Sequence, residues 1–127
     1  MKSLRYIFLL VDIGFIVYWL ITILKIIPPQ YLYSDYNNPM MIDWNWSFLP
    51  LDLCISFTGL TAVYLSNKNN EKWKKWALVS LVLTFTSGLQ AIAFWTIRLD
   101  FDVTWWLFNG FLLVYPLFYI PRFLKND

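Results

Sequence analysis

A carboxylate inside an apolar segment is the residue in this chain with the clearest chemical potential. Asp52 follows the aromatic stretch 43–50 and precedes a run of apolar and small residues. A carboxylate at the centre of a membrane helix costs about 2.5 to 3.5 kcal/mol on insertion scales, so an acid retained there usually has a function. Because an ionised carboxylate accepts hydrogen bonds and attracts cations, Asp52 is predicted to engage a cationic or hydroxyl group.

Polar residues on other apolar segments are predicted to lie at a similar depth. The depth of each residue below the outer end of its predicted helix follows from the rise of about 1.5 Å per residue. It is ~9 Å for Asp52 and for Asn109, and ~10 Å for Gln90. Thr22 lies ~8 Å down by the same count, with Trp19 one turn deeper. We predict that these side chains converge on the bundle interior. The candidate ligand-binding residues are Asp52, Gln90, Asn109, Trp19, Thr22 and Ser56.

A second acid, Asp12, lies in the first apolar segment, towards its N-terminal half. Asp12 and Asp52 are therefore candidate proton-carrying acids, because ionisable groups within membrane helices often mark proton relays. The alternative for Asp12 is a structural pairing with a nearby basic residue. Gln90 and Asn109 have a structural alternative too, since amides on membrane helices often only hydrogen-bond a neighbouring helix.

Common catalytic and cofactor-binding motifs are absent from the sequence. The chain has no His and one Cys, Cys54, which is predicted to be a buried, inert thiol. A zinc site, a hydrolase triad and a phosphate-binding glycine loop are therefore not indicated, and neither an enzyme nor a cofactor is predicted. The net charge of +2 is spread over segment ends, so nucleic acid is not a predicted partner.

Four apolar segments of about 20 residues predict an all-α, antiparallel bundle of four transmembrane helices in a single domain, 1–127. The predicted spans are 4–27, 46–65, 76–97 and 103–123, with an outer loop at 28–45 whose segment 30–39 is expected to lie on the bundle as an ordered cap. Tryptophans near the segment ends are predicted to anchor the helices at the membrane interface. They are Trp44, Trp46, Trp73, Trp76, Trp105 and Trp106.

The basic residues are divided unevenly between the two sides of this predicted bundle. Of the ten Lys and Arg residues, only Lys25 and Arg98 lie on the side that also carries Asp35, Asp43, Asp100 and Asp102. Basic residues mark cytoplasmic loops of membrane proteins. The distribution therefore predicts a multi-pass protein with both termini in the cytoplasm and the loop 28–45 outside.

The chain resembles the YvaD-type family of small four-span bacterial membrane proteins. The resemblance rests on LVDIG at 10–14, DWNWSFLPLD at 43–52 and SFTGL at 56–60, and it covers essentially the whole chain. It implies a bacterial plasma membrane and no named reaction.

The layout is also similar to that of the EXPERA domain of sterol isomerases and sigma-2-type receptors. That family has four spans, an acid in the first helix, an aromatic outer loop and an acid early in the second helix. Asp12, the loop 28–46 and Asp52 hold the corresponding places. The chain departs from the pattern because it has no His.

Three functions fit the sequence. The first is binding of a small amphiphile or lipid in a pocket around Asp52 in the outer leaflet. The second is an accessory protein that binds another membrane protein or a second copy of itself, with its polar residues serving a structural role. The third is a small proton-coupled exporter. A pocket open between helices favours the first, and a lipid-facing groove of small residues favours the second.

Overall fold

The computed structural model describes residues 2–26 and 37–125, where the chain forms four helices and no strand. The helices are α1 (Lys2–Ile23), α2 (Pro39–Asn67), α3 (Trp73–Ile97) and α4 (Val103–Lys125). Each is long and apolar enough to cross a membrane, which confirms the predicted all-α, four-helix fold. The predicted cap at 30–39 lies mostly outside the described residues.

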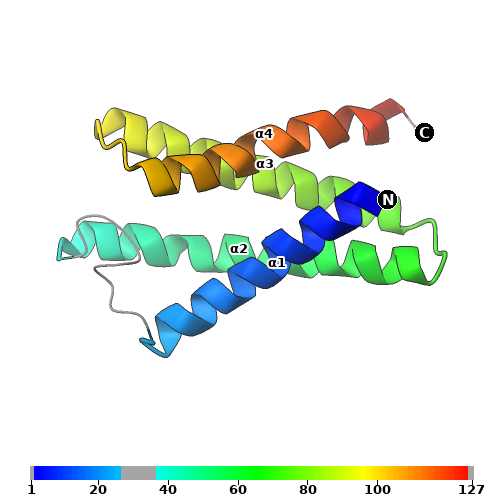
Figure 1. Cartoon of the computed structure of the whole chain (residues 1–127), viewed down its shortest axis with the longest axis horizontal. Coiled ribbons are helices and arrows are strands. Elements are labelled where there is room, and N and C mark those ends of the chain that lie inside the picture. The colour runs from blue at the N-terminus through cyan, green and yellow to red at the C-terminus, as the bar shows by residue number, and fades with distance from the viewer. Residues whose placement is uncertain (1, 27–36, 126–127) are drawn as a thin grey trace.

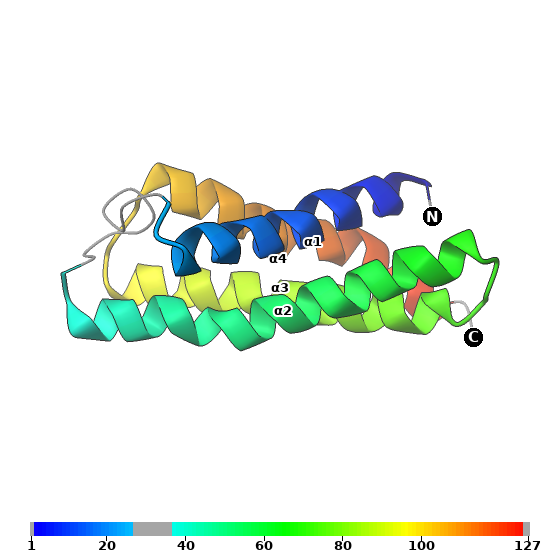
Figure 2. The ribbon, with the colours of Figure 1, turned by 90° about the horizontal axis from the view of Figure 1, so that it is seen from below.

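The helices alternate in direction, so α1 begins and α4 ends beside the α2–α3 turn (Figure 1). We call this end the basic end, because the turn carries Lys68 and Lys72. The opposite end carries Asp43, Asp100 and Asp102, and we call it the acidic end. Figure 2 shows α1 and α4 together on one side of the pair formed by α2 and α3.

Helix α2 begins at Pro39, seven residues before the predicted start at Trp46. Asn38 caps it, since its side-chain oxygen accepts a hydrogen bond from the Met40 backbone N–H at 3.0 Å. Pro39 fits the first turn because its missing N–H would have no helical partner there. Pro50 lies inside α2, and the helix continues past it. Residues 39–45, which were assigned to the loop, are thus the first two turns of α2.

Helix α1 ends at Ile23, earlier than predicted, because the chain turns into the left-handed region at Lys25 (φ 55°). The backbone N–H of Ile26 bonds back to the carbonyl of Ile21 at 3.1 Å. The same closure recurs after α2 at Asn69 and after α3 at Leu99, both with positive φ. After α2 and α3, these tight ends lead into the next helix within a few residues.

Packing follows the order of the chain, with α1 against α2, α2 against α3 and α3 against α4. Small side chains allow the close approach of neighbouring helices. The buried stripe of α3 consists of Ala77, Ser80, Leu81, Thr84, Ser87, Gly88, Ala91 and Trp95. A Cβ added at Gly88 would lie 2.6 Å from the backbone nitrogen of Leu113, so α3 and α4 almost touch there.

Candidate functional site

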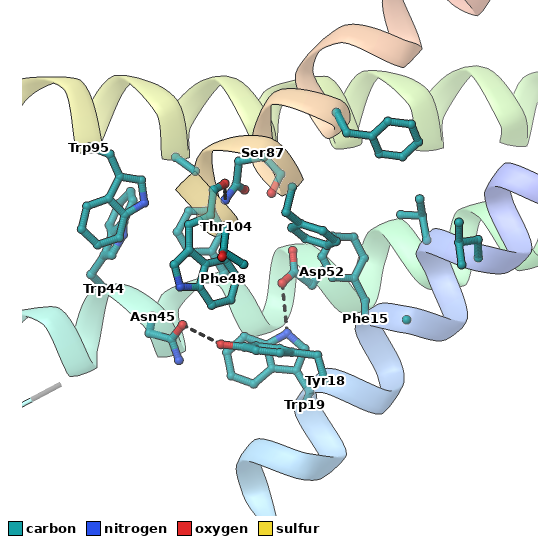
Figure 3. Close-up of a pocket in the computed structure, with 18 of the residues that line it drawn as sticks. Phe15, Tyr18, Trp19, Trp44, Asn45, Phe48, Asp52, Ser87, Trp95 and Thr104 are labelled. Atoms are coloured by element: carbon teal, nitrogen blue, oxygen red, sulfur yellow. Dashed lines mark hydrogen bonds between the residues drawn. The ribbon is translucent and has the colours of Figure 1, made fainter. Parts of the chain in front are cut away.

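Asp52 lies at the interface of α1 and α2 and is 5% exposed. The indole N–H of Trp19 on α1 donates to its Oδ2 at 3.0 Å (Figure 3). Its other oxygen, Oδ1, is buried and has no hydrogen-bond partner among the described residues. Because α2 begins at Pro39, Asp52 lies about 20 Å along the helix, deeper than the ~9 Å expected from the sequence.

A cavity of about 540 Å³ opens beside this carboxylate. All four helices contribute to its wall, which is mainly aromatic and aliphatic (Figure 3). The lining residues on α1 and α4 are Leu10, Val11, Gly14, Phe15, Tyr18, Trp19, Thr104, Trp105, Phe108, Asn109 and Phe111. Those on α2 and α3 are Met41, Trp44, Asn45, Phe48, Asp52, Ser87, Ala91 and Trp95. The volume lies within the roughly 300 to 1,000 Å³ of small-molecule sites.

Asn45 places a second polar group in the wall, two helical turns from Asp52 on the same face of α2. The Tyr18 hydroxyl donates to its Oδ1 at 3.0 Å, and its buried side-chain nitrogen has no partner among the described residues. The wall therefore offers an acceptor at Asp52 and a donor at Asn45, about 10 Å apart along the helix. Asn45 was not a candidate from the sequence, because it was assigned to the loop.

Three of the six candidate ligand-binding residues line this cavity: Asp52, Trp19 and Asn109. Asn109 is already engaged, since its side-chain nitrogen donates to the Trp105 carbonyl on its own helix at 2.9 Å. Thr22 is buried but bonds its own helix at the Tyr18 carbonyl, 2.8 Å away. Neither Thr22 nor Ser56 lines the cavity.

Gln90 is exposed on the outer face of α3, so the prediction that it points into the bundle is wrong. It follows Ser87 by three residues, but the helix turns Ala91 inwards instead, about 100° away from Gln90. The smaller residue lets α3 approach its neighbours closely. Thr86, on the same outer face, is exposed as well and bonds the Val82 carbonyl of its own helix.

Asp12 forms a separate buried site that does not line the cavity. It is 0% exposed, and neither carboxylate oxygen has a hydrogen-bond partner among the described residues. The carboxylate lies directly against Gly59 of α2, where an added Cβ would lie 2.8 Å from the Asp12 Cγ. Ser56 fixes the same crossing by donating to the Asp12 backbone carbonyl at 2.8 Å. No basic partner is found, so the predicted pairing of Asp12 is not seen within the described residues.

Two of the tryptophans assigned from sequence to the membrane interface line the cavity. Trp44 lies in the cavity wall and stacks on Phe94 with ring centroids 3.9 Å apart, and Trp105 lines the cavity from α4. The periodicity of α2 could have revealed Trp44 if the helix had been extended to Pro39. Cys54 is exposed on the outside of α2, so the prediction of a buried thiol is wrong.

Comparison with known proteins identifies relatives over nearly the full chain. Residues 4–127 match a family described as a family of unknown function, DUF5360. Uncharacterized protein YvaD of Bacillus subtilis (strain 168) is 54% identical over 126 residues, covering 99% of this chain and 95% of the relative. No solved structure matches. The resemblance to YvaD-type proteins is thus confirmed, and the chain belongs to the DUF5360 family.

Proposed function

We propose that this chain is a multi-pass protein of the bacterial plasma membrane that binds a small amphiphile in the cavity beside Asp52. One observation carries the proposal: Asp52 Oδ1 is a buried acceptor without a partner among the described residues, in the wall of a cavity of about 540 Å³. A buried polar atom without a hydrogen bond costs about 1 to 3 kcal/mol, and more when the group is charged. A ligand that donates to Oδ1 removes this cost.

The wall chemistry specifies the ligand further. A carboxylate oxygen accepts hydrogen bonds, so the head group must be a donor such as an ammonium or a hydroxyl. The faces of aromatic rings attract cations, and Trp19, Trp44 and Trp105 all line the cavity. The remaining wall is apolar and suits a hydrocarbon chain. An alkylammonium ion therefore matches both the acid and the rings.

The same proposal includes the orientation. Asp43, Asp100 and Asp102 lie at the acidic end, whereas most Lys and Arg residues lie towards the basic end. By the bias of basic residues towards the cytoplasm, both termini are cytoplasmic and the acidic end faces outwards. The cavity, lined by Trp44 and Thr104 near the acidic end, then lies in the outer half of the membrane.

An interaction protein is the second candidate, and Gln90 is the observation that favours it. Its amide is exposed on α3 about 10 Å from the helix end at Ile97. An amide that faces hydrocarbon without a hydrogen bond is costly, and a polar group on another membrane helix would satisfy it. If this is the function, Gln90→Leu lowers association with a partner helix. Ligand binding in the cavity would be unaffected by the same substitution.

The exporter hypothesis has less support. Asp12 and Asp52 lie on facing surfaces of α1 and α2, but only Asp52 lines the cavity. Asp12 is packed against Gly59 with 0% exposure, which leaves it without contact to that space.

The test measures binding of 11-bromoundecylammonium to the protein in lipid nanodiscs by quenching of tryptophan fluorescence. Trp19, Trp44, Trp95 and Trp105 line the cavity, so a bromine atom bound there quenches them. Asp52→Asn keeps the size of the side chain and removes its charge. Loss of a charge-assisted hydrogen bond, about 1.5 to 3 kcal/mol, predicts roughly a 10- to 150-fold weaker affinity.

Asp12→Asn is the matched control, because it removes the other membrane acid without touching the cavity wall. It is expected to bind the probe as the wild type does. Dodecanoate, whose head group cannot donate when ionised, should not compete. If Asp52→Asn binds the ammonium probe with wild-type affinity, Asp52 has only a structural role and the proposed function is refuted.

A further inference from the structure

We infer that the cavity exchanges its ligand with the lipid phase through an opening between α1 and α4, so that the ligand is a single-chain amphiphile already dissolved in the membrane. The inference rests on the proposed function and adds the route of access and the class of ligand. We call the opening the α1–α4 seam. It is formed by Leu10 and Gly14 of α1 and by Thr104, Phe108 and Phe111 of α4.

The side of the cavity between α1 and α4 differs from its other sides in how exposed its lining residues are. The five seam residues are the exposed members of the cavity lining, and all belong to α1 or α4. Leu10 is 71% exposed, and Phe108 and Phe111 are 43% and 41% exposed. By contrast, the lining residues of α2 and α3 are buried or half-buried. The cavity is therefore open to its surroundings between α1 and α4.

The packing of the helices explains why the cavity is open between α1 and α4. The α1–α2, α2–α3 and α3–α4 pairs pack along their backbones, but α1 and α4 have no comparable contact among the described residues. Figure 1 shows the two helices diverging towards the acidic end. Two of the three packed interfaces include a point where glycine is required, at Gly59 against α1 and at Gly88 against α4. A ligand cannot pass between helices this close without separating them.

The contacts described between α1 and α4 are side-chain contacts. Near the basic end, Ser3 and Tyr119 share a hydrogen bond of 3.0 Å. Towards the acidic end, Phe15 meets Phe108 and Tyr18 meets Trp105, each pair edge-to-face with centroids 6.1 Å apart. The stretch of α1 that includes Leu10 and Gly14 lies between the Ser3 contact and these ring contacts. A Cβ added at Gly14 meets no atom within 4 Å, so the space beside this residue is free.

The position of the seam indicates what passes through it. Gly14 lies in the middle third of α1, and a helix of this length spans the hydrocarbon core. The space beside it thus faces lipid chains and not water. A cavity of about 540 Å³ suits a drug-sized molecule, so it accommodates one head group and one chain. With the donor head group on Asp52, the chain extends along the apolar wall towards the seam.

The experiment blocks the seam without disturbing packed interfaces. Gly14→Leu places a side chain into free space at the opening. Gly110→Leu is the matched control, because Gly110 is on α4, also has no atom within 4 Å of an added Cβ, and does not line the cavity. Stopped-flow quenching follows the transfer of 11-bromoundecylammonium from phosphatidylcholine vesicles into protein-containing nanodiscs. We expect association with the Gly14→Leu variant to be at least tenfold slower, and with Gly110→Leu to match the wild type.

A second variant tests the opposite direction. Leu10→Ala removes an exposed side chain from the same edge of the seam and is expected to accelerate both association and dissociation. If Gly14→Leu fails to fold, the rates measured with Leu10→Ala decide whether the ligand enters through the seam. A wild-type rate in either folded variant overturns lateral access while leaving Asp52-dependent binding intact. If the wild-type protein shows no saturable, Asp52-dependent quenching, the proposed function itself fails.

Discussion

The contact between Asp12 and Gly59 makes a sharp prediction about stability. In an ordinary helix, Gly→Ala raises stability by about 1 kcal/mol, because Ala is the better helix former. At Gly59 the new methyl group would overlap the Asp12 carboxylate, lying 2.8 Å from Cγ and 3.1 Å from Oδ1. Overpacking typically costs about 1 to 3 kcal/mol, and an overlap this close belongs at the upper end of that range. We expect Gly59→Ala to lower the free energy of unfolding by about 2 kcal/mol.

The other glycines of the chain provide controls within the same fold. Gly14 and Gly110 have free space at the Cβ position, so Gly14→Ala and Gly110→Ala should each stabilise by up to about 1 kcal/mol. At Gly88 an added Cβ would lie 2.6 Å from a backbone nitrogen and 2.8 Å from a backbone oxygen of α4. Because backbone cannot rotate away as a side chain can, Gly88→Ala should destabilise at least as much as Gly59→Ala.

The assay is reversible unfolding by sodium dodecyl sulfate in mixed micelles, followed by tryptophan fluorescence. A double-mutant cycle then identifies the cause. Asp12→Ala removes the overlapping atoms, so Gly59→Ala should become neutral or stabilising in that background. Asp12→Asn keeps the shape and removes the charge, so the penalty should persist. Equal stabilities of Gly59→Ala and Gly14→Ala would refute the steric argument.

Other predictions concern the helix ends, the indole contact and the orientation. Leu99→Gly should stabilise the protein by about 1 kcal/mol in the same titration, because Leu99 has φ 57° and a left-handed conformation is costly for L-residues; an unchanged midpoint would contradict this. Trp19→Phe removes the indole N–H that donates to Asp52, so the free energy of unfolding should fall by about 1 to 3 kcal/mol. In a Cys54→Ser background, a Cys at Asn37 should react with an impermeant maleimide on intact cells and one at Asn69 should not. The reverse pattern would invert the proposed topology.

Much of the fold could be predicted from the sequence because the membrane imposes a simple length rule. Four apolar stretches near 20 residues gave four helices, and α4 begins at Val103 as expected. Asp52, Ser56 and Gly59 are buried on one face of α2, where their i, i+4, i+7 spacing places them. These features depend only on periodicity within one helix.

The rest depends on relations between helices that no single segment encodes. Whether Gln90 or Ala91 faces inwards is decided by the rotation of α3, which follows from close packing against its neighbours. The length of α2 was underestimated because residues 39–45 were assigned to the loop, although Asn38 and Pro39 form a good helix start. Trp44 and Trp105 of the cavity wall were assigned to the interface because they lie near the predicted helix ends. Composition alone cannot distinguish a ring that faces lipid headgroups from one that faces a cavity.

The chain-order packing of the helices also has a consequence for biogenesis. Each helix from α2 onwards packs on the one synthesised just before it, and the connections described between α2 and α3 and between α3 and α4 are a few residues long. A helix that leaves the translocon therefore finds its docking surface already in place and adjacent to it. Because the first and last helices form no comparable backbone interface, assembly does not wait for a final long-range closure. Bundles whose ends must meet expose polar residues during that delay, whereas here Asp12 and Asp52 are covered on one side as soon as the first hairpin forms.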